Sequence, residues 1–368
     1  MIKIIRGIAV VLFATALVAM VACGDDDEEE TTTGTDTGAA MEVKESRLDT
    51  VKSRDKVICA SRNDVPGYGF LEDGNNVGFD IDLCRALAAA VLGDPNKIEI
   101  RLITAAERGP TIQSGEVDML VRTVTWTTSR DSQWGNYAQT MFYDGQGFLV
   151  RKSLGISSAL ELKDASVCVT QGTTTELNLQ DFSNQNNLNI SPLTFEDTDA
   201  VVAAYEAEQC DAFTNDRSQL AALSTALSDP GAHTILPETI SEEPLGPVVP
   251  HGDDQWVDIV KTTMGMLIYA EAYGVGQASV PSSKTGDTKV DRLFGLEGSF
   301  GQESLGISNT AAQTVIRAVG NYGEIYARNL GPDGINLPRT DGDRNALWSA
   351  APCSDCPKGG QIYAAPLR

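Results

Sequence analysis

The feature of this sequence that most constrains its fold is an alternation of predicted strands and helices that runs twice along the chain. The first run has strands at 56–60, 98–103 and 117–121, with helices over 80–92 and 105–114 between them. The second run has strands at 165–170, 190–195 and 210–214, with a helix that begins at Thr173 and another over 197–208. Such alternation is typical of a mostly parallel sheet flanked by helices. The sequence therefore predicts an α/β protein with two lobes, each built on its own sheet.

Two extended segments bounded by Gly or Pro, 147–152 and 245–251, flank the second run. We interpret them as two hinge crossings, with the first lobe built from chain on both sides of the second. The predicted first lobe is 49–146 together with 251–368, and the predicted second lobe is 147–250. The C-terminal part of the first lobe, 251–368, contains a long helix over 253–273 and one further helix over 311–319. This arrangement predicts a ligand crevice between the carboxyl ends of two parallel sheets.

In the first lobe, a hydroxyl-rich segment follows the strand that ends at Val121. If the segment is extended, Thr123 and Thr125 alternate and point the same way. Arg130 then lies at the start of a helix that begins near Ser129. A guanidinium group beside hydroxyls and free N–H groups is suited to hold a carboxylate.

In the second lobe, Gly172 allows close approach of the backbone, and Thr174 lies at a helix start. We interpret these residues as a second carboxylate-binding element. Asp216 ends the next strand and is suited to an ammonium group. Alone, each of these residues is more often a cap or a surface ion pair. Together with Arg130 across one cleft, they predict a receptor for a zwitterion.

Four residues are candidates for the pocket that holds the ligand side chain: Tyr68, Phe70, Arg108 and Trp126. The competing interpretation is packing for the three aromatic residues and a surface ion pair for Arg108. His233 and His251 are too isolated to predict catalysis or a metal site. We therefore expect no catalytic residue, no metal and no cofactor.

Six cysteines follow Cys23, and an even number behind an export signal favours disulfides, with 15 pairings formally open. Their distribution over the predicted elements favours pairing between neighbours in the sequence: Cys59 with Cys84, Cys168 with Cys210, and Cys353 with Cys356. A redox or metal motif at 353–356 is the weaker interpretation, because this Pro- and Gly-rich stretch has no βαβ unit around it and no second ligand pair.

The N-terminus predicts export. Residues 1–22 combine a basic start with an apolar stretch at 8–21, which is typical of a signal peptide. A small residue before Cys23 predicts a lipoprotein signal with Cys23 as the lipid anchor, and an ordinary cleaved signal peptide is the alternative. Residues 23–48, rich in acidic residues, Thr and Gly, predict a flexible tether. The protein is therefore expected outside the cytoplasm, tethered to a membrane.

Charge excludes one class of partner. The formal net charge of the chain is −23. Residues 1–40 contribute two basic and seven acidic residues, or −5, which leaves −18 on the remainder. A surface this acidic repels phosphate backbones, so we expect no nucleic-acid partner. It also repels an anionic bilayer, so we expect membrane contact only through the lipid.

The sequence resembles the extracellular solute-binding proteins of family 3, and among them the general L-amino-acid-binding subunits of polar-amino-acid ABC importers. The resemblance spans 56–368. Its matching stretches are GFDIDLCRA at 78–86, SGEVD at 114–118, TWTTSRD at 125–131, QGTTTELN at 171–178, CDAFTNDR at 210–217, VGNYGE at 319–324 and GGQIYAAPLR at 359–368.

The resemblance implies the type II, two-lobed fold of periplasmic binding proteins and a monomer that delivers L-amino acids to a membrane permease. It implies that Arg130 and Thr174 hold the ligand carboxylate, that Asp216 binds its ammonium group, and that Thr123 and Thr125 supply hydroxyls. It also implies the Cys59–Cys84 and Cys168–Cys210 pairs. The loop at 62–70, which contacts the ligand side chain in such proteins, is only loosely similar here, and Cys353–Cys356 departs from the pattern.

Two other functions are compatible with this fold. Some proteins that share it are prephenate or arogenate dehydratases, in which a carboxylic acid protonates a leaving hydroxyl, and the candidates here are Glu107 and Asp211. Neither has a partner that the sequence identifies. A sensor module is disfavoured, because no spanning helix or signalling domain follows. We therefore expect a binding protein and not an enzyme.

Overall fold

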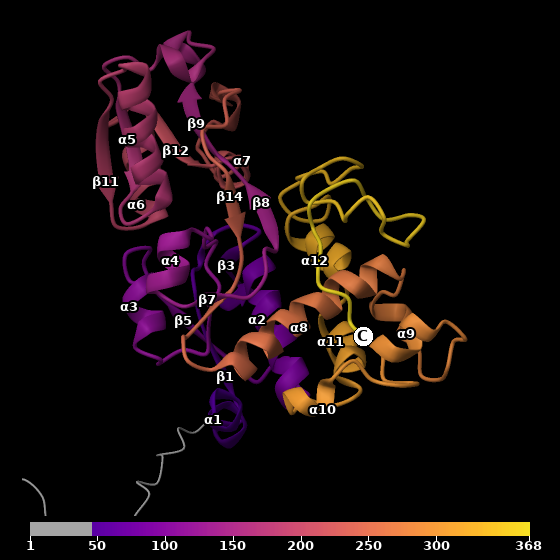
Figure 1. Ribbon diagram of the computed structural model, residues 1–368. Helices are drawn as coiled ribbons and strands as arrows, with labels where there is room; N and C mark the ends of the chain where they lie inside the picture. The colour runs from indigo at the N-terminus through magenta and orange to yellow at the C-terminus, as the bar shows by residue number, and fades with distance from the viewer. Residues whose placement is uncertain (1–45) are drawn as a thin grey trace, which may run out of the picture. The chain divides into compact units, whose positions relative to one another are not determined.

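A computed structural model describes residues 46–368, and Figure 1 shows their arrangement. The predicted signal peptide, Cys23 and most of the predicted tether lie outside the described residues. The last predicted tether residues, 46–48, belong to the start of a helix and not to a flexible tether: Ser46 caps helix α1 (Arg47–Arg54), and its side chain accepts a hydrogen bond from Asp49 N. None of the helices in the described part of the chain combines the length and apolar character needed to cross a bilayer.

Two five-stranded sheets form the centres of two lobes, as the two runs of strands and helices predict. The first sheet has the order β5 (Ile98–Leu102), β1 (Val57–Ser61), β6 (Met119–Leu120), β15 (Val248–Val249), β7 (Asn136–Tyr137). The second has the order β11 (Ser191–Phe195), β10 (Ser166–Thr170), β12 (Ala212–Asp216), β9 (Gln146–Arg151), β13 (His233–Ile235). In each sheet the three predicted strands run parallel, and two further strands, which the sequence analysis did not predict, extend them through antiparallel pairing. The inner added strand, β15 or β9, runs antiparallel to the three, and the outer one, β7 or β13, runs parallel to them again. A small sheet of β2 (Asp64–Val65), β3 (Gly69–Glu72) and β4 (Asn75–Val77) completes the first lobe.

Helices pack around both sheets. Those of the first lobe are α1, α2 (Phe79–Leu92), α3 (Arg108–Gln113), α4 (Thr128–Gln133) and α8 (Asp254–Ala272). Those of the second lobe are α5 (Thr174–Asn186), α6 (Thr198–Glu206) and α7 (Arg217–Ser224). The helix predicted over 80–92 is α2, whose N-cap is Gly78, with Asp80 in its first turn and not at its cap. The helix predicted over 105–114 is shorter, because a turn precedes Arg108.

The two connections between the lobes are the paired antiparallel strands β8 (Phe142–Asp144) and β14 (Glu243–Leu245), which lie side by side in Figure 1. The crossing predicted at 147–152 differs, because most of that segment is β9, a strand inside the second sheet. In the segment predicted as the other crossing, 245–251, Val248 and Val249 belong to the first sheet. The reason is chemical. The segment contains the apolar, buried residues Phe148, Leu149 and Val150, so it pairs with neighbouring strands and packs inside the second lobe instead of forming an exposed crossing.

Alternation along the strands of the second lobe supplies both faces of its sheet. Leu149, Cys168 and Phe213 belong to one buried cluster, and their neighbours Phe148, Val150 and Val167 belong to another. Successive side chains of a strand point to opposite faces, so one sheet buries apolar residues on both sides. This double burial fixes the register of the strands and hence the place where they end.

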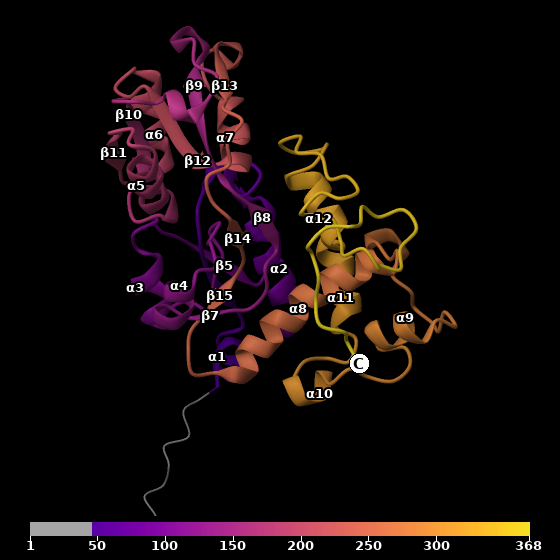
Figure 2. The same ribbon diagram turned by 45° about the horizontal axis from the view of Figure 1, so that its top comes forward.

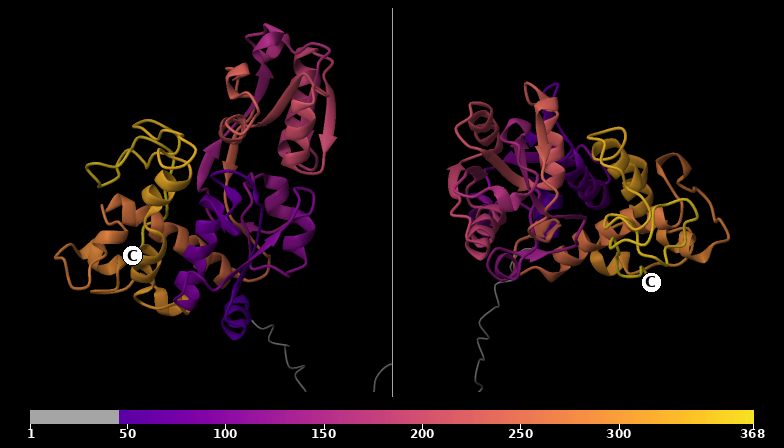
Figure 3. Two further views of the ribbon diagram at one scale, coloured as in Figure 1. Left: turned by 180° about the vertical axis from the view of Figure 1, so that it is seen from behind. Right: turned by 90° about the horizontal axis from the view of Figure 1, so that it is seen from above.

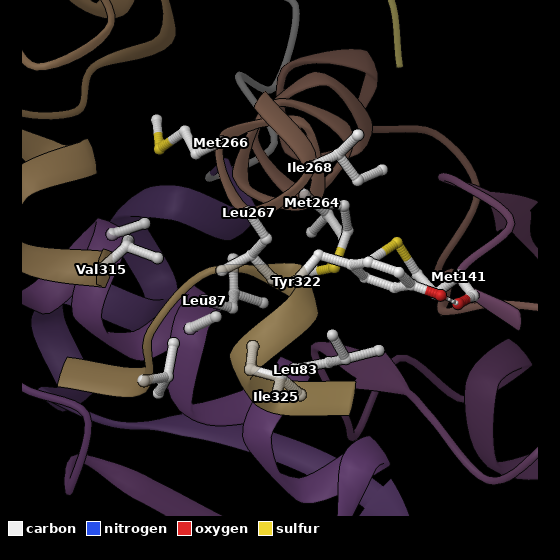
Figure 4. Packing of buried hydrophobic residues seen from close by; sticks show 14 of the residues in the cluster. Leu83, Leu87, Met141, Met264, Met266, Leu267, Ile268, Val315, Tyr322 and Ile325 are labelled. Atoms are coloured by element: carbon white, nitrogen blue, oxygen red, sulfur yellow. Dashed lines mark hydrogen bonds between the residues drawn. The ribbon is translucent and has the colours of Figure 1, made fainter. Parts of the chain in front are cut away.

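The largest core of the molecule lies between helices. Leu83 and Leu87 of α2, Met264 and Leu267 of α8, Val315 of α11 (Ala311–Val319) and Ile325 of α12 (Tyr322–Asn329) pack together, as Figure 4 shows. The Tyr322 hydroxyl donates a hydrogen bond to Met141 O at 2.9 Å, just before β8. The C-terminal helices thus complete the first lobe and reach the chain that leads into the hinge.

The C-terminal extension contains more structure than the single helix that the sequence analysis predicted. Besides α11 it forms α9 (Thr288–Leu293), α10 (Gln302–Leu305) and α12. Figures 1 and 2 show these helices across α8 from α3 and α4, and Figure 3 shows the orange and yellow C-terminal part gathered on one side of the first lobe. Short, Gly-separated helices carry weak sequence signals, which is why α9, α10 and α12 were missed.

The cysteine pairs confirm the predicted pairing between sequence neighbours. Disulfides join Cys59 to Cys84, Cys168 to Cys210, and Cys353 to Cys356. The first ties β1 to α2, and the second ties β10 to the start of β12. Both cross-links hold strands whose carboxyl ends matter for the site described below.

A buried ion pair fixes the C-terminal extension to α8. Arg339 pairs with Glu271, and both side chains are 7% exposed. The Arg339 guanidinium also lies 5.1 Å from the ring centres of both Tyr322 and Tyr326. By contrast, the Arg344–Glu242 pair is exposed, at 47% and 75%.

We predict that Arg339→Ala lowers the free energy of unfolding by ~3 kcal/mol, because the Glu271 carboxylate stays buried without its partner. Arg344→Ala, the matched control, should cost less than ~1 kcal/mol. Urea denaturation followed by circular dichroism measures both. Equal losses in the two variants contradict the assignment of Arg339 as the residue that fixes the extension.

Candidate ligand-binding site

A small pocket lies where strands of both lobes end. Its lining residues follow the carboxyl ends of β1, β6, β10 and β12 or belong to the helix starts and loops beside them. They are Arg62, Ala105, Arg108, Arg122, Thr123, Thr125, Thr170, Thr173, Thr174, Thr175, Thr198, Thr214, Asn215, Asp216 and Gln219. Ligands of open α/β folds bind at this edge of a sheet. The cavity volume of about 30 Å³ leaves room for no more than a few water molecules.

Five of the residues singled out in the sequence line this pocket: Thr123, Thr125, Thr174, Asp216 and Arg108. The lobes meet directly here, since the Thr125 and Thr174 hydroxyls lie 3.3 Å apart. The Thr174 hydroxyl also donates to Glu243 Oε2 at 3.1 Å. Hydroxyls from both lobes therefore surround the space that a small polar ligand must enter.

Thr123 reaches the pocket by a route that the sequence analysis did not predict. Its φ of 44° lies in the left-handed region, so the segment is not simply extended. A β-branched residue is strained there, and such strain is typical of functional sites. Thr123 N donates to Asp80 Oδ2 at 2.8 Å, and the Arg62 guanidinium donates to Thr123 Oγ1 at 3.1 Å. Burial raises the pKa of Asp80 to about 6, while the hydrogen bond from Thr123 acts in the opposite direction.

Arg130 is buried next to the pocket, but it is not among the lining residues. Thr127 caps α4 and accepts from Arg130 N, which places Arg130 in the first turn. Its Nη1 donates to Thr125 O at 3.2 Å, and its guanidinium lies 4.8 Å from the Trp134 ring centre. Arg130 therefore contacts the backbone of a residue whose side chain lines the pocket.

The three aromatic candidates for the side-chain pocket lie outside it. Tyr68 is fully buried, and its hydroxyl lies 2.6 Å from Ser218 Oγ. Phe70 is 36% exposed and lines a separate groove. Trp126 is 38% exposed and stacks on Tyr137 with ring centres 5.4 Å apart. The structure favours packing for Tyr68 and Trp126, whereas Phe70 borders the separate groove. Only Arg108 of this set lines the pocket.

The lining residues that were not singled out in the sequence include Arg62, Arg122, Thr198 and Gln219. Arg62 directly follows β1, and Arg122 follows β6 by two residues. The criterion that selected Asp216, a polar residue at the carboxyl end of a strand, also selects these two. Thr198 and Gln219 lie at helix starts of the second lobe and carry no comparable signal.

Among the lining residues, the first lobe contributes three guanidinium groups, those of Arg62, Arg108 and Arg122. Arg62 pairs with Asp64 at 2.6 Å, whereas neither Arg108 nor Arg122 forms an ion pair with any carboxylate of residues 46–368. Burial, and then the charges of Arg130 and Arg122, lower the pKa of Arg108 well below its usual value. Burial and the charge of Arg62 lower the pKa of Arg122 to about 9. Each buried guanidinium favours the approach of an anion.

The second lobe contributes Asp216, the one carboxylate among the lining residues. Burial, followed by the charges of Asp144 and Glu243, raises the pKa of Asp216 well above its usual value. Burial also raises the pKa of Asp144 to about 6, against hydrogen bonds from Ser218 and Gly145. No cluster of three or more metal-binding side chains occurs among the residues that the structure describes. A cation that approaches Asp216 relieves this repulsion, so the pocket is suited to a ligand with separate negative and positive ends.

We predict that Asp144→Asn raises the free energy of unfolding, relative to wild type, more at pH 8 than at pH 5. The folded pKa of Asp144 lies above the ordinary aspartate value, so its contribution to stability is present at low pH and is lost as pH rises through about 6. Asparagine stays neutral, so the difference between variant and wild type should grow by ~1 kcal/mol from pH 5 to pH 8. Exposed Asp258→Asn is the control, and urea denaturation at both pH values is the measurement. A difference that does not change with pH contradicts the buried charge at Asp144.

Comparisons with known proteins agree with this geometry. The sequence matches the bacterial extracellular solute-binding proteins, family 3, over residues 57–273. It is 45% identical to the general L-amino acid-binding periplasmic protein AapJ of Rhizobium johnstonii, covering 89% of this chain and 95% of that one. It is 43% identical to the glutamate/glutamine/aspartate/asparagine-binding protein BztA of Rhodobacter capsulatus, covering 88% and 94%.

A solved structure is similar over the same extent. The ABC transporter periplasmic binding protein of Brucella ovis, with glutathione bound, superposes with a TM-score of 0.81 at 39% identity, covering 88% of this chain and 100% of that one. A family match over more than half of the chain, together with relatives that cover 88–89% of it, leaves one assignment. The chain belongs to the bacterial extracellular solute-binding proteins of family 3.

Proposed function

We propose that this protein captures L-amino acids between its lobes and delivers them to the permease subunits of an ABC importer. The observation that carries the proposal is the pocket lined by guanidinium groups of the first lobe and by the Asp216 carboxylate of the second. An α-amino acid has both complementary charges on one carbon. The names of the Rhizobium and Rhodobacter relatives, both amino-acid-binding proteins, support the same ligand class.

In this proposal the ligand ammonium group binds Asp216 and its carboxylate binds Arg130, with the hydroxyls of Thr123, Thr125 and Thr174 beside it. Arg130 supports this role by its position, because it is held through Thr125, a lining residue. The Trp134 ring covers its guanidinium and keeps it from water. A fork of donors that is already buried loses little further solvation when a carboxylate replaces a backbone oxygen.

Entry of an amino acid requires the lobes to separate. The cavity of about 30 Å³ is too small for a whole amino acid, and groups of the two lobes contact each other across it. Rotation about β8 and β14 opens this space. A ligand that contacts both lobes only when they are closed shifts the population toward closure, and a closed pair of lobes is the form that a permease can recognise.

The excess of arginine over carboxylate lining the pocket bears on side-chain selectivity. If Arg130 holds the α-carboxylate, then Arg108 and Arg122 face the rest of the ligand without ion-pair partners among the described residues. We infer a preference for side chains that end in a carboxylate or an amide. The ligands in the name of the Rhodobacter relative belong to this class. The glutathione bound to the Brucella protein also carries an α-amino acid group and carboxylates.

Family membership places the protein outside the cytoplasm. We further propose that Cys23 is acylated, that 23–45 tether the folded part to the membrane, and that the protein is monomeric. The sequence supports the tether, because residues 24–38 contain seven acidic residues and no apolar side chain. Mass spectrometry of the purified full-length protein detects the lipid directly.

The dehydratase alternative finds no support at the pocket. The two candidate acids, Glu107 and Asp211, are not lining residues. A hydrogen bond from Thr104 lowers the pKa of Glu107, and one from Ser166 lowers the pKa of Asp211. A general acid needs the opposite shift. The relatives are also named as binding proteins and not as enzymes.

We predict that Arg130→Ala and Asp216→Ala each weaken amino-acid binding by ~100-fold or more, because removal of one partner of a desolvated charge pair costs ~3–5 kcal/mol. A thermal-shift screen against the twenty L-amino acids identifies binders, and calorimetry measures affinity. Lys261→Ala, on α8 away from the pocket, is the control. Unchanged affinity in both site variants contradicts the site, and a wild type that binds none of the twenty contradicts the function.

We predict that Arg108→Gln weakens binding of L-glutamate about tenfold more than binding of L-glutamine, because it removes a positive charge from a poorly screened pocket. The exposed arginine Arg101, which pairs with Glu116, gives the control Arg101→Gln. Calorimetric titration with both amino acids is the measurement. Equal losses for the two ligands mean that Arg108 does not read side-chain charge.

A further inference from the structure

A chain of hydrogen bonds crosses from the first lobe to the candidate ammonium-binding carboxylate of the second. Arg62 Nη1 donates to Gln219 Oε1 at 3.0 Å, and Gln219 Nε2 donates to Asp216 Oδ2 at 2.7 Å. The three residues are 5%, 2% and 5% exposed. Buried groups satisfied in this way hold one another in a single arrangement.

The folds of both lobes determine this geometry. Asp216 ends β12 and Gln219 lies three residues later in the first turn of α7, so one strand-to-helix junction carries both. On the other lobe, Arg62 follows β1 and is held by Asp64 at 2.6 Å and by Thr123 Oγ1. Its remaining donors go to the second lobe, to Gln219 and to Thr198 Oγ1 at 2.6 Å.

The partners fix the orientation of the Gln219 amide. Its oxygen accepts from a guanidinium, which has only donors, and its NH₂ group donates to a carboxylate. A flipped amide places donor against donor and acceptor against acceptor. The amide therefore acts as a polar link with one possible direction, from Arg62 in one lobe to Asp216 in the other.

We propose that Gln219 is a positioning residue, which holds the Asp216 carboxylate for the ligand ammonium group and couples that carboxylate to lobe closure through Arg62. The inference rests on the proposed function. When the lobes separate, Arg62 leaves with the first lobe and the amide loses the contact that orients it. The carboxylate is then held in its binding position only in the closed form, so recognition of the ammonium group and closure become one event.

The surroundings of Asp216 explain why such a link is useful. Asp144 on β8 and Glu243 on β14 repel its charge, Arg62 attracts it, and the Gln219 hydrogen bond favours its ionised form. Loss of the hydrogen bond makes the ionised carboxylate harder to form. An ammonium ligand needs that ionised form, so a change at Gln219 should appear in the pH dependence of binding and not only in its strength.

The test uses Gln219→Met, which keeps the length of the side chain and removes both hydrogen bonds. Calorimetry with L-glutamine as the probe at pH values from 5 to 8 measures affinity. We expect binding about tenfold weaker at pH 7 and a pH midpoint of binding about one unit higher than in wild type. Arg62→Met should shift the midpoint in the same direction, and the double variant should show less than the sum of the two effects.

Gln302→Met is the matched control. Gln302 is also a buried glutamine with two hydrogen bonds, from Phe300 N and to Asn309 O, but it lies on α10 outside the pocket. It should cost similar stability in urea and leave the pH midpoint unchanged. A Gln219→Met variant whose midpoint equals that of wild type, or a Gln302→Met variant that shifts as much, overturns the inference. The proposed function still stands in that case if wild type binds L-amino acids and Asp216→Ala weakens this binding as predicted above.

Discussion

The site depends on one electrostatic constraint, the burial of the Asp216 carboxylate beside two others, Asp144 and Glu243. Charges of the same sign that share a buried space raise each other's free energy, and this protein places them there without a lysine or arginine in ion-pair contact among the described residues. The arrangement destabilises the protein itself. It is relieved by a cation that enters from the cleft, so the cost in stability becomes selectivity for a ligand with an ammonium group.

The hinge is restrained from the side of the first lobe. Asn345 accepts from Tyr143 N at 2.7 Å and donates to Tyr143 O at 3.0 Å, and Tyr326 stacks on Phe142. These contacts of the C-terminal extension hold β8 as far as Tyr143. Gly145 then follows, where a side chain would meet Thr239 and Ser241 O at 2.3 and 2.7 Å. The extension therefore confines backbone rotation in this crossing to the few residues between Tyr143 and β9.

The sequence predicted those parts of the fold whose signals are local and strong. Apolar strands, helix caps such as Thr173, and the cysteine pairs are of this kind. The sequence did not predict that Gln146–Arg151 joins the second sheet, because an apolar strand at a domain boundary looks the same whether it crosses or pairs. Side chains were harder still. The structure places Tyr68, Phe70 and Trp126 outside the pocket. The sequence could not show this, because whether an aromatic residue packs or faces a ligand depends on distant neighbours such as Phe142 and Tyr137.

Direct contacts between the lobes set how strongly a ligand can act as a switch. Arg62 bonds to Thr198 and Gln219, Arg108 Nη2 donates to Gly172 O at 3.0 Å, and Tyr68 meets Ser218. At a net ~1 kcal/mol each, such hydrogen bonds favour closure by protein groups alone. A ligand moves the equilibrium only by its difference in affinity between the two forms. Strong contacts between the lobes thus raise the affinity for the ligand and reduce the shift toward closure that the ligand causes. Side chains such as Arg62 therefore have to serve both affinity and ligand-dependent closure.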